Sequence, residues 1–153
     1  MKKIITLLSA CLFISLMGFS QKEKVFPEDV PAAVNQAFAN KFPDATDIHY
    51  QMENKDYEIN FKFNGVETSA NFDPTGKWLE TETGLKQSEL PKEVIASISK
   101  NFAGFKLSEI GKVETPSHGV SYEMDLKKGN EGYEVQFNAK GDILSKVPLK
   151  KED

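Results

Sequence analysis

The sequence predicts an α+β fold: two tandem α-β-β-β-β units that form an antiparallel sheet, with the helices packed on one face. Three observations predict this fold. The spacing of Phe72-Asp-Pro-Thr-Gly76 recurs in Phe137-Asn-Ala-Lys-Gly141, sixty-five residues later. Each copy follows runs of period-two alternation, which are typical of strands. Each set of runs follows a helical apolar pattern that begins at a proline, so one unit occurs twice.

Residues 1–20 have the pattern of a secretory signal peptide, with two lysines followed by an apolar run. A membrane anchor is one rival interpretation, but the apolar run at residues 4–19 has sixteen residues, fewer than the about 20 that usually span a bilayer. A lipoprotein box at Leu8-Ser-Ala-Cys11 is another, but the residues after Cys11 stay apolar. We therefore expect a periplasmic or secreted protein that begins at Gln21, with no cysteine and no stable membrane insertion after signal cleavage.

The charge balance excludes one class of partner. Without the two lysines of the signal peptide, seventeen lysines face 23 acidic residues, a net charge of −6. A protein of this charge is not expected to bind nucleic acid. The cationic residues are all lysines, so bidentate arginine clamps on phosphate or carboxylate are excluded.

The first unit is predicted over residues 29–84, after a loose lead-in at residues 21–28. A helix is expected from Val30 to Lys41, with Asp29 as its cap and Pro43 preventing its continuation. The apolar stripe of this helix comprises Val30, Val34, Ala37 and Phe38.

Four strands should follow this helix. Their apolar faces contain Ile48, Tyr50 and Met52, then Tyr57, Ile59, Phe61 and Phe63, then Val66, Thr68, Ala70 and Phe72, and the fourth strand runs from Lys77 to about Thr83. The turns fall at Asn54-Lys55-Asp56, at Asn64-Gly65 and at Gly76.

A polar link at residues 85–89 separates the units, and the second unit is predicted over residues 90–149, before a charged tail at residues 150–153. Val94, Ile98 and Phe102 follow Val34, Phe38 and Phe42 by sixty residues. The offset then becomes sixty-five, and we place the five extra residues in loops near Gly104 and Pro116-Ser-His-Gly119. The units should share one eight-stranded sheet with both helices on one face and the other face open.

The repeated Val/Leu-Pro helix start, the four strands and the Phe-Asp/Asn-x-x-Gly hairpin resemble the PepSY-like, β-lactamase-inhibitor-protein-like family of secreted bacterial proteins. The resemblance covers nearly all of residues 29–149. It implies a small domain of the cell envelope, and for some members of the family inhibition of hydrolases. No inhibitory residue of the family can be placed on this sequence by a motif.

The sequence contains no catalytic or metal-binding constellation. His49 and His118 occupy unrelated positions in the two units, and Ser117 is only a sequence neighbour of His118. Asp73 offers a single carboxylate for calcium, which needs several oxygen ligands. We therefore expect no enzyme activity and no cofactor.

Two features of the open face are candidates for binding. Alternation places an acidic set there, with Lys62 as the main cation: Asp47, His49, Gln51, Asp56, Glu58, Glu67, Glu80 and Glu82. Such a set either contacts a basic partner or forms a solvated surface. Trp78 and its counterpart Ile143 are expected on the same face as an apolar anchor; the alternative is that Trp78 packs in the core.

The predicted function is that of a non-enzymatic module that binds another envelope protein through its open sheet face, for example by restraining a hydrolase. The predicted site contains Trp78, Glu80, Glu82, Glu58, His49 and Ile143. The alternative is a domain that binds or senses a small apolar ligand. Large inward-facing side chains favour the protein partner because they fill the core. The oligomeric state is left open.

Overall fold

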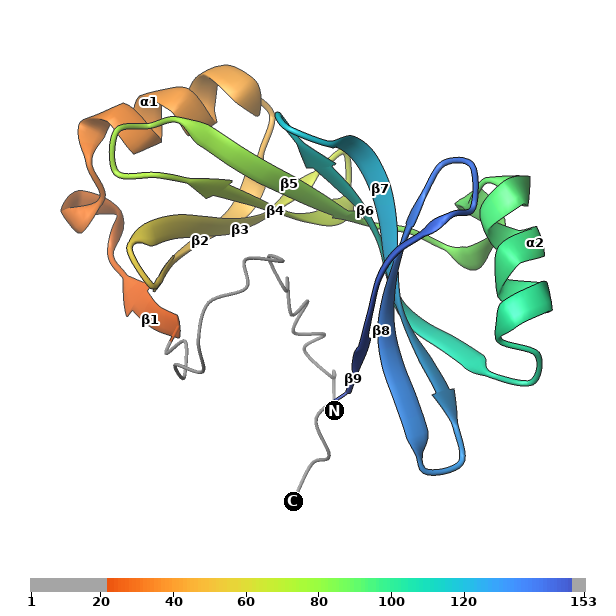
Figure 1. Ribbon diagram of the computed structural model, residues 1–153. Coiled ribbons are helices and arrows are strands. Elements are labelled where there is room, and N and C mark those ends of the chain that lie inside the picture. The colour runs from red at the N-terminus through yellow and green to blue at the C-terminus, as the bar shows by residue number, and fades with distance from the viewer. Residues whose placement is uncertain (1–21, 150–153) are drawn as a thin grey trace.

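The computed structural model describes residues 22–149, which form one antiparallel sheet of nine strands in chain order, β1 to β9, and two α-helices (Figure 1). The strands are β1 (Lys22–Val25), β2 (Thr46–Glu53), β3 (Asp56–Phe63), β4 (Val66–Phe72), β5 (Trp78–Gly84), β6 (Lys106–Thr115), β7 (Gly119–Lys128), β8 (Glu131–Asn138) and β9 (Ile143–Pro148). The helices are α1 (Ala32–Lys41) and α2 (Lys92–Asn101). The predicted signal peptide with Cys11 and the tail at residues 150–153 lie outside the described residues.

The helix of each unit covers the four strands that follow it, which gives two separate cores. Beneath α1, Val34 and Phe38 pack on Ile59, Phe61 and Phe72. The predicted stripe is confirmed, since Val30, Val34 and Phe38 are buried and Ala37 packs against the same cluster. The helix owes its place to this stripe, because its intrinsic stability at ten residues is marginal.

The second core repeats the first beneath α2. Val94, Ile98 and Phe102 pack there on Val135 and Phe137. These residues were expected at the buried positions of the second helix, and the expectation is confirmed. The two cores share no residue, so the units are joined by the sheet itself. The joining pair is β5 with β6, from Thr81 opposite Glu114 to Gly84 opposite Gly111.

Three expectations about this architecture are corrected. The lead-in is not all loose, because residues 22–25 form the edge strand β1, which pairs with β2. Asp29 does not cap α1; it ends a short 3₁₀ turn, Pro27–Asp29, and Pro31 occupies the N-cap position. The five extra residues are not confined to loops. β6 and β7 have 10 residues each where β2 and β3 have 8, and their turn is one residue longer.

The turn before the last strand of each unit is built by one side chain. Asp73 Oδ1 accepts hydrogen bonds from the backbone N–H groups of Thr75 (2.8 Å) and Lys77 (3.1 Å). Asn138 Oδ1 accepts the same pair from Lys140 (2.9 Å) and Asp142 (3.0 Å). Asp and Asn are therefore equivalent here, because the turn needs only a short side-chain oxygen.

The glycine of each turn lies directly against the first turn of its helix. A Cβ on Gly76 would come within 2.5 Å of the carbonyl oxygen of Ala33, and one on Gly141 within 2.4 Å of that of Glu93. Both glycines also have positive φ, +84° and +82°. Only glycine satisfies both conditions, so these two contacts fix how closely each helix approaches the sheet.

Both edges of the sheet are unsuited to pairing with further strands. β1 has only four residues, and Glu23 and Lys24 in it are exposed. β9 ends at Pro148, which has no N–H to donate. Short, charged or proline-bearing edges oppose edge-to-edge aggregation. Within the described residues, neither helix is long and apolar enough to cross a membrane.

Gly141→Ala should destabilise the protein far more than the matched control Gly65→Ala. Gly65 also has positive φ (+78°), but nothing lies within 4 Å of its Cβ position. The control should lose about 1 kcal/mol of unfolding free energy through backbone strain. Gly141→Ala should lose about 2–5 kcal/mol, because the backbone of α2 must also move. Urea unfolding of the variants measures the difference, and equal losses would refute the proposed contact.

Candidate functional site

The helix-free face of the sheet is concave. Figure 1 shows the sheet bent between its two halves, with α1 and α2 on the outer side. On the inner side, side chains form continuous cross-strand rows. One row runs through His49, Asn60, Ser69, Glu82, Val113, Ser121 and Asn138. The face is therefore a single surface to which both units contribute.

The acidic residues predicted for this face do lie on it. Glu58 and Glu80 are both cross-strand neighbours of Asn71, one on either side. Glu58 and Glu82 are buried, and Glu80 is half-buried. The second unit adds Glu123, Asp125 and Glu134, which the sequence analysis did not single out. Their alternation with Tyr122, Met124 and Leu126, which pack against the second core, could have identified Glu123 and Asp125.

Two glutamates, Glu82 and Glu123, lie at the centre of the concave face, next to the glycines Gly84 and Gly111. Gly84, Gly111 and Glu123 are cross-strand neighbours. A Cβ on Gly111 would come within 2.7 Å of Glu82 Oε1, so the missing side chain leaves room for that carboxylate. Burial raises the pKa of Glu123 to about 9, and the charges of Glu134, Glu82, Glu80 and Asp125 raise it further in that order. Glu123 is therefore protonated at neutral pH.

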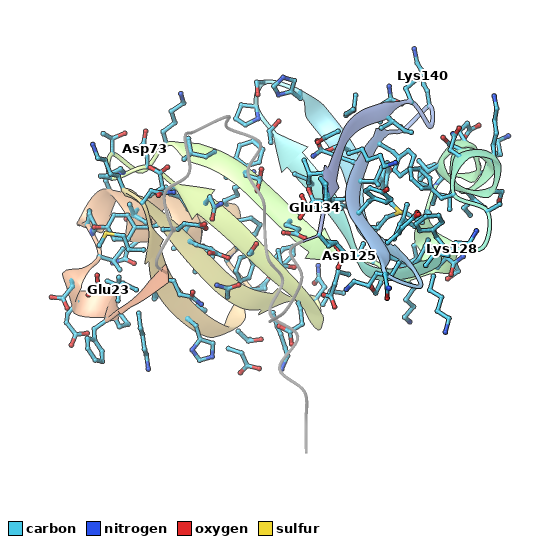
Figure 2. All side chains as sticks on the ribbon, turned by 60° about the horizontal axis from the view of Figure 1, so that its bottom comes forward. Glu23, Asp73, Asp125, Lys128, Glu134 and Lys140 are labelled. Carbon is cyan, nitrogen blue, oxygen red and sulfur yellow. The ribbon has the colours of Figure 1, made fainter. Side chains whose placement is uncertain are left out.

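A second acidic pair lies beside this centre on β7 and β8. Asp125 and Glu134 are directly opposite each other in the register, and Figure 2 shows them together on the inner side. Burial, and then the charge of Asp125, raises the pKa of Glu134. Lys127 Nζ lies 3.0 Å from Asp125 Oδ2 and offsets part of this charge. In the same view Lys128 and Lys140 project from the hairpin ends of the second unit.

The outer rim in the first unit is exposed, and one lysine there contacts two carboxylates. His49 is exposed on β2, where its neighbour on β3 is Asn60. Lys62 Nζ lies 2.6 Å from Asp47 Oδ2 and 3.9 Å from Glu67 Oε1. The hydrogen bond from Lys62 lowers the pKa of Asp47. The predicted main cation is thus engaged by Asp47 and Glu67 at the rim.

Trp78 does not lie on this face, so its predicted role as an open-face anchor is wrong. Phe72 pairs with Trp78 but Asn71 pairs with Glu80, so β5 contains one extra residue at this bulge. A bulge reverses the alternation of side chains beyond it. Trp78 consequently packs against the first core beneath α1. Its Nε1 donates to Thr81 Oγ1 at 2.9 Å.

Ile143 is displaced from the predicted face for the same reason. Phe137 pairs with Ile143 but Gln136 pairs with Ser145, which is the same bulge in the second unit. Ile143 therefore lies beside Ala96 and Ser97 of α2 and is 42% exposed. The structure brings Glu58, Glu80, Glu82 and His49 to one face and separates Trp78 and Ile143 from them.

Catalytic chemistry has little support among residues 22–149. Ser117 Oγ does contact His118 Nδ1 at 2.8 Å, which the sequence analysis did not expect, but the pair is exposed at the tip of the β6–β7 turn. No carboxylate in the described part of the chain bonds this histidine, so a relay is incomplete. Asp73, the candidate calcium ligand, accepts hydrogen bonds within its own turn. No group of three or more His, Cys, Asp or Glu in the described residues could hold a metal ion.

Glu123→Gln should make the protein more stable at neutral and alkaline pH. An ordinary glutamate has a pKa near 4.5, whereas folded Glu123 keeps its proton to about pH 9. The folded state therefore binds more protons between these values, and stability falls as pH rises through this window. The amide removes this penalty, about 1–3 kcal/mol at pH 7. Urea unfolding from pH 5 to pH 9 should show a flatter profile for the variant.

The control for this experiment is Glu114→Gln on the opposite face, where Glu114 Oε1 lies 2.7 Å from Lys112 Nζ. It should keep the wild-type slope. Parallel profiles for wild type and Glu123→Gln would contradict the assignment of Glu123 as a buried neutral acid.

Trp78→Ala should destabilise the fold, because Trp78 is part of the first core. We expect a loss of about 3 kcal/mol from the transfer and cavity terms. Trp78→Phe should lose less, since a ring remains beneath Lys41, whose Nζ lies 3.8 Å from the indole centroid. Thermal unfolding measures both variants. An unchanged midpoint for Trp78→Ala would restore Trp78 as a surface residue.

A family model described as "Putative beta-lactamase-inhibitor-like, PepSY-like" matches residues 19–67 and 55–145. None of the curated proteins with which the sequence was compared matches it.

Several solved structures share the fold. A BLIP-like protein from Bacteroides fragilis is 22% identical, with 84% of this chain and 92% of that chain covered and a TM-score of 0.74. A "putative periplasmic" protein from Bacteroides eggerthii is 23% identical, with 78% and 88% covered and a TM-score of 0.73. A DUF2874 family protein from Bacteroides ovatus is 22% identical, with 78% and 89% covered and a TM-score of 0.73. Since the family model matches well over half of the chain, the protein belongs to the PepSY-like, beta-lactamase-inhibitor-like family.

Proposed function

We propose that the protein is a non-enzymatic binding module of the cell envelope, which binds another protein through the concave face of its sheet. In this proposal the bound protein is restrained by being covered, and a hydrolase is the class of partner that the family description suggests. The observation that carries the proposal is the continuous carboxylate-rich surface on the inner side of both units.

The shape of the face supports a protein partner. Its rows of side chains extend from β2 to β8, and both helices lie on the other side of the sheet. A surface of this extent suits a convex loop or domain rather than a small molecule. The apolar side chains that face the helices are packed into the two cores, so they give no support to the alternative of a small apolar ligand.

The charge of the face determines the kind of partner. Glu80, Asp125 and Glu134 surround the centre, and Lys127 pairs with Asp125. A partner that presents lysine or arginine side chains would be steered toward this face and held in one orientation. An acidic partner would be repelled. Location in the envelope is supported by the predicted signal peptide and by the Bacteroides eggerthii neighbour, whose description is periplasmic.

Glu80→Lys should weaken the capture of the partner while Glu28→Lys does not. Glu80 borders the centre of the concave face, whereas Glu28 is exposed on the 3₁₀ turn before α1. The tagged secreted protein is used to recover partners from the periplasm of its native host, and the recovered protein is then purified. Reversal of the charge at Glu80 should slow its association about tenfold at low salt and reduce the salt dependence.

Two results would contradict this function. Equal association rates for the two charge reversals would remove the concave face as the binding surface. A broad hydrolase screen that finds turnover by the protein itself, abolished by substitution of Ser117 or His118, would overturn the non-enzymatic assignment.

A further inference from the structure

The two units differ where the last strand passes beside the helix. In the first unit this space is occupied by Trp78, which packs against the core beneath α1. Its ring is covered by the ammonium group of Lys41, with Nζ 3.8 Å from the centroid. In the first unit, therefore, an indole ring with a cation over its face fills the space between helix and strand.

In the second unit the corresponding space is a groove. Ile143 pairs with Phe137 as Trp78 pairs with Phe72, so the two residues are structurally equivalent. The smaller side chain leaves an open groove of about 430 Å³ between α2 and β9. The groove is lined by Ala96, Ser97, Lys100, Asn101, Gly141, Asp142 and Ile143.

The lining of the groove resembles the surroundings of Trp78 in its chemistry. Ala96 and Ile143 supply apolar contact. Lys100 supplies a cation from the last turn of α2, one residue before Asn101, which occupies the position of Lys41 in α1. Asn101 Nδ2 donates to Ser97 Oγ at 3.2 Å and to the Ser97 carbonyl at 3.0 Å, which fixes the polar rim. The positive charge of Lys100 complements the negative face of an aromatic ring.

We propose that the groove between α2 and β9 binds an exposed aromatic side chain of a partner protein, in the place that Trp78 fills in the first unit. Leu144, the residue after Ile143, is 50% exposed and does not line the groove. The groove lies on the helix-bearing side of the sheet, so it is a second binding surface, separate from the concave face. A partner can occupy it while the concave face is also occupied.

A second copy of the chain fits this groove less well. Within residues 22–149, Phe26 is the exposed aromatic residue that another copy would offer, at 57% exposure. Lys24 Nζ lies 5.9 Å from the centroid of that ring. Insertion of Phe26 would bring Lys24 toward Lys100, and like charges oppose such a contact. An aromatic residue flanked by neutral or acidic side chains has no such conflict.

The first test uses the secreted protein and two probes, N-acetyltryptophan amide and N-acetylleucine amide. We expect the tryptophan probe to shift the methyl resonances of Ile143 and Ala96 saturably, in the millimolar range typical of one side chain. The leucine probe should bind at least threefold more weakly. Lys100→Met keeps the apolar stem and should weaken the tryptophan probe about threefold. Equal binding of the two probes, or no saturable shift, would overturn the proposal.

The second test fills the groove with a side chain of the protein itself. Ile143→Trp should raise the midpoint of thermal unfolding, protect the new indole from iodide quenching and abolish binding of the tryptophan probe. The matched control is Leu144→Trp at the neighbouring exposed position, whose indole should be quenched freely and leave probe binding intact. Equal quenching of the two new indoles would overturn the proposal. A dimer that forms at the probe concentrations and dissociates in the Phe26→Ser variant would also overturn the proposal, because the occupant of the groove would then be a second copy of the chain.

Discussion

The contact on which this structure depends is that of a turn glycine with the first turn of a helix. Gly76 meets the carbonyl of Ala33, and Gly141 meets that of Glu93, at distances that exclude any Cβ. Each contact sets one helix close against the strands that follow it, which lets Phe38 or Ile98 reach the strand side chains beneath. Since both contacts lie on the same side of one sheet, both helices do too. Among residues 22–149, no helix covers the opposite side, which can serve as a surface.

The duplication gives two units, or frames, with the same arrangement of helix and strands but different side chains at equivalent positions. In the first frame Trp78 and Lys41 close the space between α1 and β5. In the second, Ile143 leaves it open while Lys146 lies over the ring of Tyr133, 3.7 Å from its centroid. The longer β6–β7 hairpin also belongs to the second unit alone. Stability of the repeated frame thus depends on the shared glycine turns, and the differences between the units are where separate functions can arise.

The sequence predicted the elements whose signals are local. Period-two alternation located β3 and β4, the proline and the apolar stripe located both helices, and the glycine spacing revealed the duplication. Alternation failed at Trp78 and Ile143, because one extra residue at each bulge reverses the face and no residue type marks that insertion. β1 was missed because it has only four residues, three of them charged, which is too short a run to show a period. The acidic face was predicted for the first unit only. The clustering of Glu82 with Glu123 depends on the register in which β5, β6 and β7 pair, and the spacing of residues in the sequence does not reveal that register.

The burial of Glu123 at the centre of the concave face lowers the stability of the free protein at neutral pH. Glu123 is held as the neutral acid by burial and by four neighbouring carboxylates. A sheet selected for stability alone would place apolar or paired residues there, as it does on the other face, where Lys112 pairs with Glu114. Under the proposed function the cost is recovered on binding. A cationic group brought to Glu123 would favour its charged form, so a proton would leave as the partner arrives. The absence of a side chain at Gly111 gives Glu82 the room to lie beside Glu123, so both carboxylates would meet the same cationic group.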